Sequence, residues 1–185
     1  MGHAGENARH GRHTWKMSWD VTVTGAVTTC FLVVYVLNVL VDRSFHTELS
    51  PAVAGGLTFE VTAGGPFGYL MAGFVIKALS LGVAIALMWI MLNRIKRGQL
   101  YSESTARLAG GTSGAMLAWL LGNFVENMGN NFAASRLGIG DQWSGPLLTN
   151  ISVMVIVFLL IAMLYVLQQA IRNALGMQED IDGLV

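Results

Sequence analysis

The sequence predicts an all-α, polytopic membrane protein in which four transmembrane helices form an antiparallel bundle. Two observations lead to this fold class. Of the 185 residues, 54% are hydrophobic and 12% are charged, which is far from the usual balance of a soluble domain. The apolar residues also gather in four stretches, each close to or above the roughly 20 residues that cross about 30 Å of hydrocarbon. These stretches are Val21–Val41, Pro66–Leu92, Leu108–Val125 and Leu147–Leu167.

The four stretches differ in strength. The first and the last carry no charged residue, the second is interrupted only by Lys77, and the third is diluted by glycines and Asn123. With their flanks included, helices are expected at about residues 20–42, 66–93, 104–128 and 146–172. They form one transmembrane domain (20–172) between a flexible cytoplasmic tail (1–19) and an acidic cytoplasmic tail (173–185).

The longest segment outside the helices follows the first one, at residues 42–65, and is expected to form a small outer cap. Within it, Leu57–Thr62 lies between two glycine pairs, which is typical of one short strand or half of a hairpin. Residues 127–146, between the third and fourth helices, are rich in Asn and Gly and are predicted to form a second outer loop.

Positive charges predict the orientation, because Lys and Arg are retained on the cytoplasmic side during insertion. Eight of them lie on one side of the helices and two, Arg43 and Arg136, on the other. Both termini and the 93–107 connection are therefore expected in the cytoplasm. The basic residues of this connection, which we expect to meet anionic lipid headgroups, are Arg94, Lys96, Arg97 and Arg107.

Lys77 is the main candidate for function, since an ionisable group inside a membrane is costly and needs a reason. It lies about 11 residues after Pro66, or about 16 Å into the bilayer. A lysine stem reaches several ångströms along the membrane normal, so we predict that Lys77 pairs with Glu126, with Asn123 as a bridge. Both belong to a polar face of the third helix with three- and four-residue spacing: Asn123, Glu126, Asn127, Asn130 and Asn131.

This pair has two interpretations. In the simpler one it locks the second and third helices together, or Lys77 extends toward water or backbone carbonyls. In the other, Lys77, Glu126 and the neighbouring Asn123 and Asn127 form a substrate or ion site in an outward-facing cavity. A transport path usually has several ionisable residues strung through the membrane, whereas here one lies near the middle.

The third helix also carries small residues every four positions. Such a stripe lets two helix backbones approach closely, which in lipid replaces the missing hydrophobic drive. It indicates tight packing inside one bundle or, alternatively, a surface for a partner protein or a second copy. Its members are Gly110, Gly114, Ala118 and Gly122.

Several classes of activity lack their residues. A single cysteine, Cys30, excludes a thiol oxidoreductase that works through paired cysteines. The four histidines lie in the tail or in a loop, so no predicted helix carries haem ligands. The sequence has no glycine-rich phosphate loop, no His-Glu-x-x-His and no serine elbow. We therefore expect no catalytic residue, metal site or cofactor, and the zero formal net charge gives no indication of nucleic-acid binding.

Two segments carry a resemblance to a known family. Residues 93–108 (NRIKRGQLYSESTARL) combine a basic helix end, Gly98 as a helix stop, and Ser102 as an N-cap followed by Glu103. Residues 177–185 (MQEDIDGLV) close an acidic stretch with a small apolar pair. With its four helices and cytoplasmic ends, the chain from Asp20 onward resembles the bacterial membrane proteins grouped as domain of unknown function 2975.

The chain departs from that family at Ala109 and Gly110, where a further basic residue often follows the arginine. The family has no assigned activity, so the resemblance implies the architecture and a bacterial plasma membrane but no catalytic residue.

Together these patterns favour a non-catalytic integral membrane protein that serves as an accessory, regulatory or assembly subunit of a larger membrane system. Its expected partners are the lipid bilayer and a membrane protein or a second copy of the chain. The alternative is a small oligomeric transporter or channel with a polar path through Lys77, Asn123 and Glu126.

Overall fold

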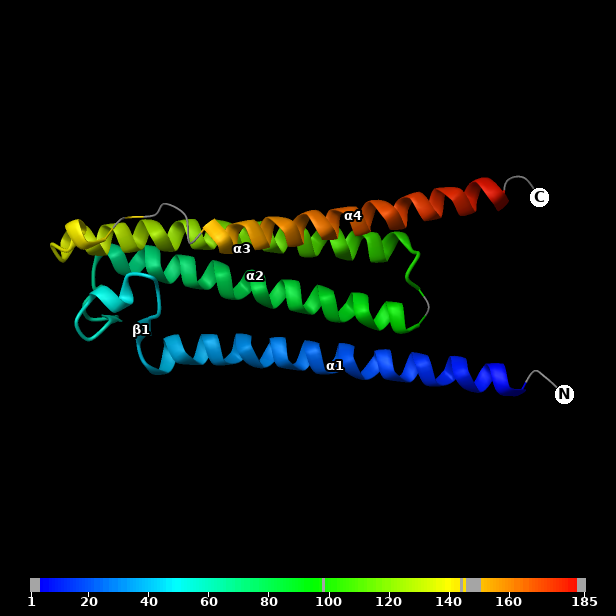
Figure 1. Cartoon of the computed structure of the whole chain (residues 1–185). Coiled ribbons are helices and arrows are strands. Elements are labelled where there is room, and N and C mark those ends of the chain that lie inside the picture. Colours follow the sequence, from blue (N-terminus) through cyan, green and yellow to red (C-terminus); the bar gives the residue numbers. More distant parts are fainter. Residues whose placement is uncertain (1–3, 98, 144, 146–150, 183–185) are drawn as a thin grey trace.

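The computed structural model describes residues 4–97, 99–143, 145 and 151–182. In this part of the chain, four long helices lie side by side (Figure 1): α1 (Ala4–Val41), α2 (Gly65–Lys96), α3 (Glu103–Arg136) and α4 (Ile151–Asp182). Each of the four contains a segment long and apolar enough to cross a membrane. The prediction of an all-helical chain with four such segments is therefore confirmed.

Helices α2 and α3 form the interior of the molecule. The buried residues of α2 recur at alternating four- and three-residue spacing, as in Leu70, Gly73, Lys77, Ser80 and Ala84. This spacing keeps one seam of α2 against its partner, as in left-handed helix pairs. Glycines bring the two backbones close, because a Cβ atom on Gly73 would lie 2.7 Å from the backbone nitrogen of Glu126.

Helices α1 and α4 flank this hairpin. Tyr35 of α1 packs on Phe74 of α2 with 5.6 Å between ring centroids, and Gly110 of α3 lies under Gln168 of α4. In the most apolar window of α1 and of α4, 11% of the residues are buried, against 28% in α2 and α3. The flanking helices therefore leave most of their apolar surface uncovered.

The structure corrects the predicted end of the third helix. Residues 129–136, assigned to the outer loop 127–146, continue α3 to Arg136. Ala133 and Ala134 are buried good helix formers, and the helix stops where Gly138 takes a φ of +69°. There the N–H of Ile139 donates to the carbonyl of Ala134 at 3.1 Å, which is the Schellman arrangement for a helix end.

The flanking helices α1 and α4 also extend further than expected. α1 begins at Ala4, inside the segment assigned to a tail, and α4 continues to Asp182 instead of ending near 172. The apolar part of α1 is Thr22–Val41. The expected boundary near residue 20 therefore marks where the apolar run begins and not where the helix begins. Residues 4–19 contain no proline to stop it. The predicted start of the fourth helix, at 146, lies outside the described residues, and the flexibility of both tails stays a prediction.

The segment between α1 and α2 forms a small cap. Strand β1 (Ser44–Phe45) pairs antiparallel with β2 (Leu57–Thr58), so the strand expected at 57–62 is only two residues long and turns follow it. A short 3₁₀ helix lies in this segment at Ser50–Ala52. Another, at Gly140–Gln142, follows α3. Fully buried Leu49 and Leu57 join this cap to Leu70 of α2 in one hydrophobic cluster.

Candidate functional site

The structure brings Lys77 and Glu126 together. The Lys77 Nζ lies 2.6 Å from Glu126 Oε2, and the two side chains are 10% and 11% exposed. Lys77 follows the start of α2 at Gly65 by twelve residues, and Glu126 precedes the end of α3 at Arg136 by ten. At about 1.5 Å per residue both therefore lie roughly 15–18 Å from the same end of the hairpin, which is why they can meet.

Two glycines make room for this ion pair. A Cβ atom on Gly122 would lie 2.7 Å from Lys77 Cγ, so the lysine stem runs directly over the α3 backbone. On the other helix, a Cβ atom on Gly73 would lie 2.8 Å from Glu126 Cβ. Any larger side chain at these positions would push the helices apart. The charged pair is thus enclosed between the two helix backbones, where little water screens its mutual attraction.

A third side chain in this site was not predicted from the sequence. The Lys77 Nζ lies 5.7 Å from the centroid of the Tyr35 ring, on α1. A desolvated ammonium is stabilised by the electron-rich face of an aromatic ring. The available signal was the position of Tyr35 well inside the first apolar stretch, away from the membrane interfaces where tyrosine is enriched.

Asn123 does not form the expected bridge. Its side chain is buried, with 8% of the residue exposed, and its Nδ2 reaches no hydrogen-bond acceptor in the described part of the chain. Lys77 and Glu126 contact each other directly, so they need no intermediary. A buried amide without a partner costs about 1–3 kcal/mol, which makes Asn123 the unexplained polar group of this site.

The remaining asparagines of the polar face lead from the ion pair toward the cap between α1 and α2. Asn130 donates through Nδ2 to Asn127 Oδ1 at 3.3 Å, and Thr47 in the cap donates to Asn130 Oδ1 at 2.7 Å. Further out, Trp143 Nε1 donates to Asn131 Oδ1 at 2.7 Å. These bonds explain why an Asn-rich sequence continues as a helix here. Asn127 therefore takes part, through Asn130, in the attachment of the cap.

The predicted stripe of small residues does not act as one surface. Gly122 packs on α2 at Lys77, Gly110 packs on α4 at Gln168, and a Cβ atom on Gly114 would have no atom within 4 Å. Ala118, between them, is half-buried. The close contacts of α3 with α2 instead use Gly122 and Gly129, seven residues apart, and Gly129 lies against Leu70. Gly73 and Gly129 were not predicted from the sequence. The available signal was the seven-residue spacing of Gly122 and Gly129, which is typical of one face packed against a neighbouring helix.

The basic residues at the connection between α2 and α3 are largely bonded within the chain. Arg94 donates to Ser104, and Lys96 Nζ donates to Thr22 Oγ1 of α1 at 2.9 Å. Ser102 caps α3 by accepting from the N–H of Thr105 at 3.2 Å. Glu103 pairs with Arg107 at 3.3 Å and with Arg172 of α4 at 3.8 Å, while Arg97 is exposed. These contacts tie the end of α2 to the middle of α1 and to the start of α3, and the start of α3 to α4.

Comparisons with protein families, with curated proteins and with solved structures find no match for this chain. No group of three or more His, Cys, Asp or Glu that could hold a metal ion occurs among the described residues. Within the described part of the chain, the site offers one buried ion pair, an aromatic ring beside it and one amide nitrogen without an acceptor.

Proposed function

We propose that this chain is a non-catalytic, multi-pass protein of a bacterial plasma membrane, with its helices inserted as an antiparallel bundle and both termini in the cytoplasm. It acts as an accessory, regulatory or assembly subunit of a larger membrane system. The resemblance of its inner connection and its C-terminus to domain of unknown function 2975 supports the location.

The observation that carries this proposal is the contrast between the hairpin and its flanking helices. In the interior hairpin, a buried ion pair lies between glycines and holds α2 and α3 together. Its two charges therefore neutralise each other within the fold. Helices α1 and α4 each pack mainly on one neighbour and expose large apolar side chains such as Phe31, Phe158 and Met163. A subunit that assembles with another membrane protein needs a rigid interior and free helix faces of this kind.

The experiment is native mass analysis of the tagged full chain, extracted in mild detergent, with identification of every protein that copurifies. A second protein at fixed stoichiometry is expected. Repetition with Lys77→Met should lower the amount of the complex and of the chain together, because the lock is lost. A chain that is always recovered alone, at full abundance, would contradict an accessory role.

One observation favours a second function, an oligomeric transporter or channel with a path through Lys77, Asn123 and Glu126. Asn123, three residues before Glu126 on α3, has an amide nitrogen with no acceptor among the described residues, as expected of a site that exchanges hydrogen bonds with a passing ligand. This function requires a closed homo-oligomer. It also requires Lys77→Met to abolish flux in vesicles while the protein stays abundant, which is the opposite of the outcome expected for a lock.

A further inference from the structure

A hollow of about 310 Å³ lies in the cap between α1 and α2. This volume is at the lower end of the range for small-molecule sites, about 300–1,000 Å³. Its walls come from two segments that the antiparallel ladder brings together, one directly after α1 and one at β2. The N–H of Phe59 in the second segment donates to the carbonyl of Arg43 in the first at 2.8 Å. The hollow is lined by Asp42, Arg43, Thr58, Phe59 and Glu60.

The lining carries both signs of charge, and these charges are not paired with each other. Among the described residues, the Arg43 guanidinium and the Glu60 carboxylate have neither a hydrogen-bond nor an ion-pair partner. The Asp42 carboxylate lies 3.9 Å from His46, and both side chains are half exposed. One guanidinium and two carboxylates therefore border one space. A ligand that matches them carries a cation for the carboxylates and an anion for the guanidinium.

The backbone of Arg43 is strained. Its φ is +47°, and it is the one non-glycine residue with a positive φ in the described part of the chain. This conformation brings a Cβ atom too close to the following carbonyl oxygen, whereas glycine adopts it freely. An arginine at this position holds a guanidinium at the hollow at a cost in stability. Residues kept in such conformations cluster at sites that bind ligands.

The residue types of the lining specify the two charged groups of the ligand. A primary ammonium has three N–H donors, which the carboxylates of Asp42 and Glu60 accept. A quaternary ammonium has none and is recognised by a cage of several aromatic rings, whereas one ring, that of Phe59, lines this hollow. For the anion, the planar guanidinium of Arg43 suits a phosphate, which it binds through two parallel hydrogen bonds. The lining therefore matches a zwitterion with a primary ammonium and a phosphate.

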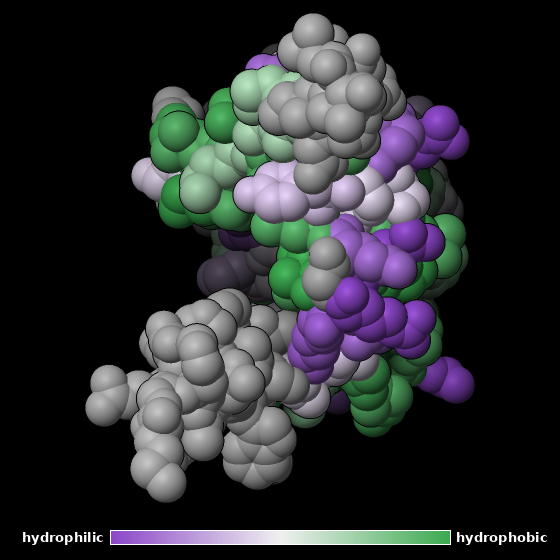
Figure 2. All heavy atoms as spheres, turned by 90° about the vertical axis from the view of Figure 1, so that its right-hand side faces the viewer, coloured by the Kyte–Doolittle hydropathy of each residue, from purple (hydrophilic) through white to green (hydrophobic). Residues whose placement is uncertain are grey.

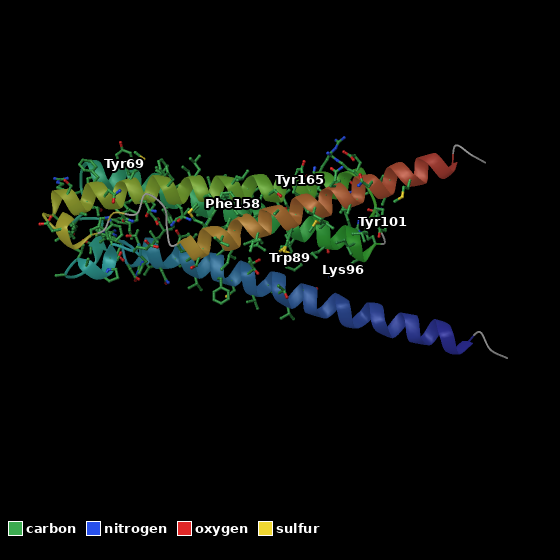
Figure 3. All side chains as sticks on the ribbon, turned by 45° about the horizontal axis from the view of Figure 1, so that its top comes forward. Tyr69, Trp89, Lys96, Tyr101, Phe158 and Tyr165 are labelled. Carbon is green, nitrogen blue, oxygen red and sulfur yellow. The ribbon has the colours of Figure 1, made fainter. Side chains whose placement is uncertain are left out.

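The position of the hollow favours a lipid as the source of this zwitterion. Val41 ends the apolar segment of α1, is 74% exposed and directly precedes Asp42. Exposed Tyr69 lies at the same end of the helices, and Lys96 and Tyr101 lie at the other end (Figure 3). That other end faces the viewer in Figure 2, where hydrophilic residues gather on part of the surface. Tyrosine is enriched at headgroup level, so in a bilayer the hollow lies beside the headgroups and Val41 beside the acyl chains.

Resting on the proposed insertion in a bacterial plasma membrane, we propose that this hollow binds the headgroup of a phospholipid that carries a primary ammonium next to its phosphate. The phosphate lies against the Arg43 guanidinium, and the ammonium lies between the carboxylates of Asp42 and Glu60. The acyl chains run along the exposed apolar side of α1. A lipid bound in this way attaches the cap to the outer leaflet.

Native mass spectrometry of the full chain in mild detergent measures this binding. The probes are phosphatidylethanolamine and phosphatidylcholine with the same acyl chains, and soluble phosphoethanolamine. We expect phosphatidylethanolamine to bind about three- to tenfold more tightly than phosphatidylcholine, because methylation removes the N–H donors. Soluble phosphoethanolamine should bind more weakly than either lipid, since it has no acyl chain to bury. Equal binding of the two lipids, or binding of the soluble compound as tight as that of phosphatidylethanolamine, would overturn the proposal.

Two variants separate the cation side of the hollow from its anion side. Glu60→Gln should remove the difference between the two lipids, whereas Asp141→Asn, at an exposed position outside the lining, should keep it. Arg43→Gly should weaken binding of both lipids about three- to tenfold. It also relieves the positive φ, so its unfolding midpoint should rise, which distinguishes a lost contact from a lost fold. Unchanged binding in either variant, or a lower midpoint for Arg43→Gly, would overturn the proposal.

The lipid measurement and the copurification experiment fail independently. A chain that is recovered without a second protein and still prefers phosphatidylethanolamine would remove the accessory function and support the lipid site. A chain with a fixed partner and equal binding of the two lipids would leave the accessory function standing and overturn the lipid site.

Discussion

The α2–α3 hairpin and the two flanking helices are built from helices of similar length, yet they are held in different ways. Between α2 and α3, glycines bring the backbones together and the Lys77–Glu126 pair lies between them. Helices α1 and α4 instead rest on the hairpin through rings and single side chains, such as Tyr35 on Phe74. The stability of the hairpin therefore depends on a few exact fits, whereas the flanking helices should tolerate change.

The largest effect is expected where one charge of the buried pair is removed. Lys77→Met leaves Glu126 uncompensated between two helices, and Glu126→Leu does the same to Lys77. Breaking a buried pair in this way costs about 3–5 kcal/mol, so each single variant should unfold at much lower denaturant in reversible unfolding by SDS. The double variant Lys77→Met/Glu126→Leu is the control and should recover most of the loss. If it is as unstable as the single variants, the pair is not a lock.

A smaller effect is expected from filling the close contact at Gly73. The Cβ of Gly73→Ala would meet the backbone of Glu126 at 2.7 Å, and backbone cannot rotate away as a side chain can. Overpacking of this kind typically costs about 1–3 kcal/mol.

Gly114→Ala is the matched control, because the added Cβ meets no atom within 4 Å and alanine is favoured over glycine in a helix interior by roughly 0.5–1 kcal/mol. The two substitutions should therefore shift the unfolding midpoint in opposite directions. Equal shifts would show that the α2–α3 contact at Gly73 is packed no more tightly than the open helix face at Gly114.

The helices and the ion pair of the hairpin could be predicted from the sequence, whereas the contacts between neighbouring helix faces could not. The four apolar helices follow from apolar length alone, and the meeting of Lys77 and Glu126 follows from counting depth along two helices. The end of α3 did not, because asparagines that signal a loop in isolation here bond to each other and to Thr47. Tyr35 and Gly73 were missed because their role depends on which faces of neighbouring helices meet, and that is a property of packing which a single sequence does not display.

The contact between α1 and α2 at Gly25 is as close as the contact at Gly73 but should respond differently to substitution. A Cβ atom on Gly25 would lie 2.7 Å from the ring of Trp89, as close as the contact at Gly73. Here, however, a side chain on a sparsely covered helix pair has room to turn aside. Gly25→Ala should thus cost about 1 kcal/mol, at the low end for overpacking. Gly82→Ala, where the added Cβ would meet Leu32 at an ordinary 3.9 Å, is the control and should be slightly stabilising, as at Gly114. A loss for Gly25→Ala as large as that for Gly73→Ala would mean that α1 is held as rigidly as the hairpin.

The smallest effect is expected at the start of α3, where ion pairs are open to solvent. Glu103 is 49% exposed and faces Arg107 and Arg172 at 76% and 47%, so its pairs are weakened by water and salt and are worth about 0–1 kcal/mol. Glu103→Gln should lower the unfolding midpoint slightly at low salt, and the difference from the parent should disappear near 1 M salt, where the screening length is about 3 Å. The buried pair is enclosed by helix backbones, so the loss from Lys77→Met should persist at the same salt concentration. A salt-independent loss at Glu103 would show instead that the α3–α4 end is packed as closely as the hairpin, and would place α4 with the interior of the molecule.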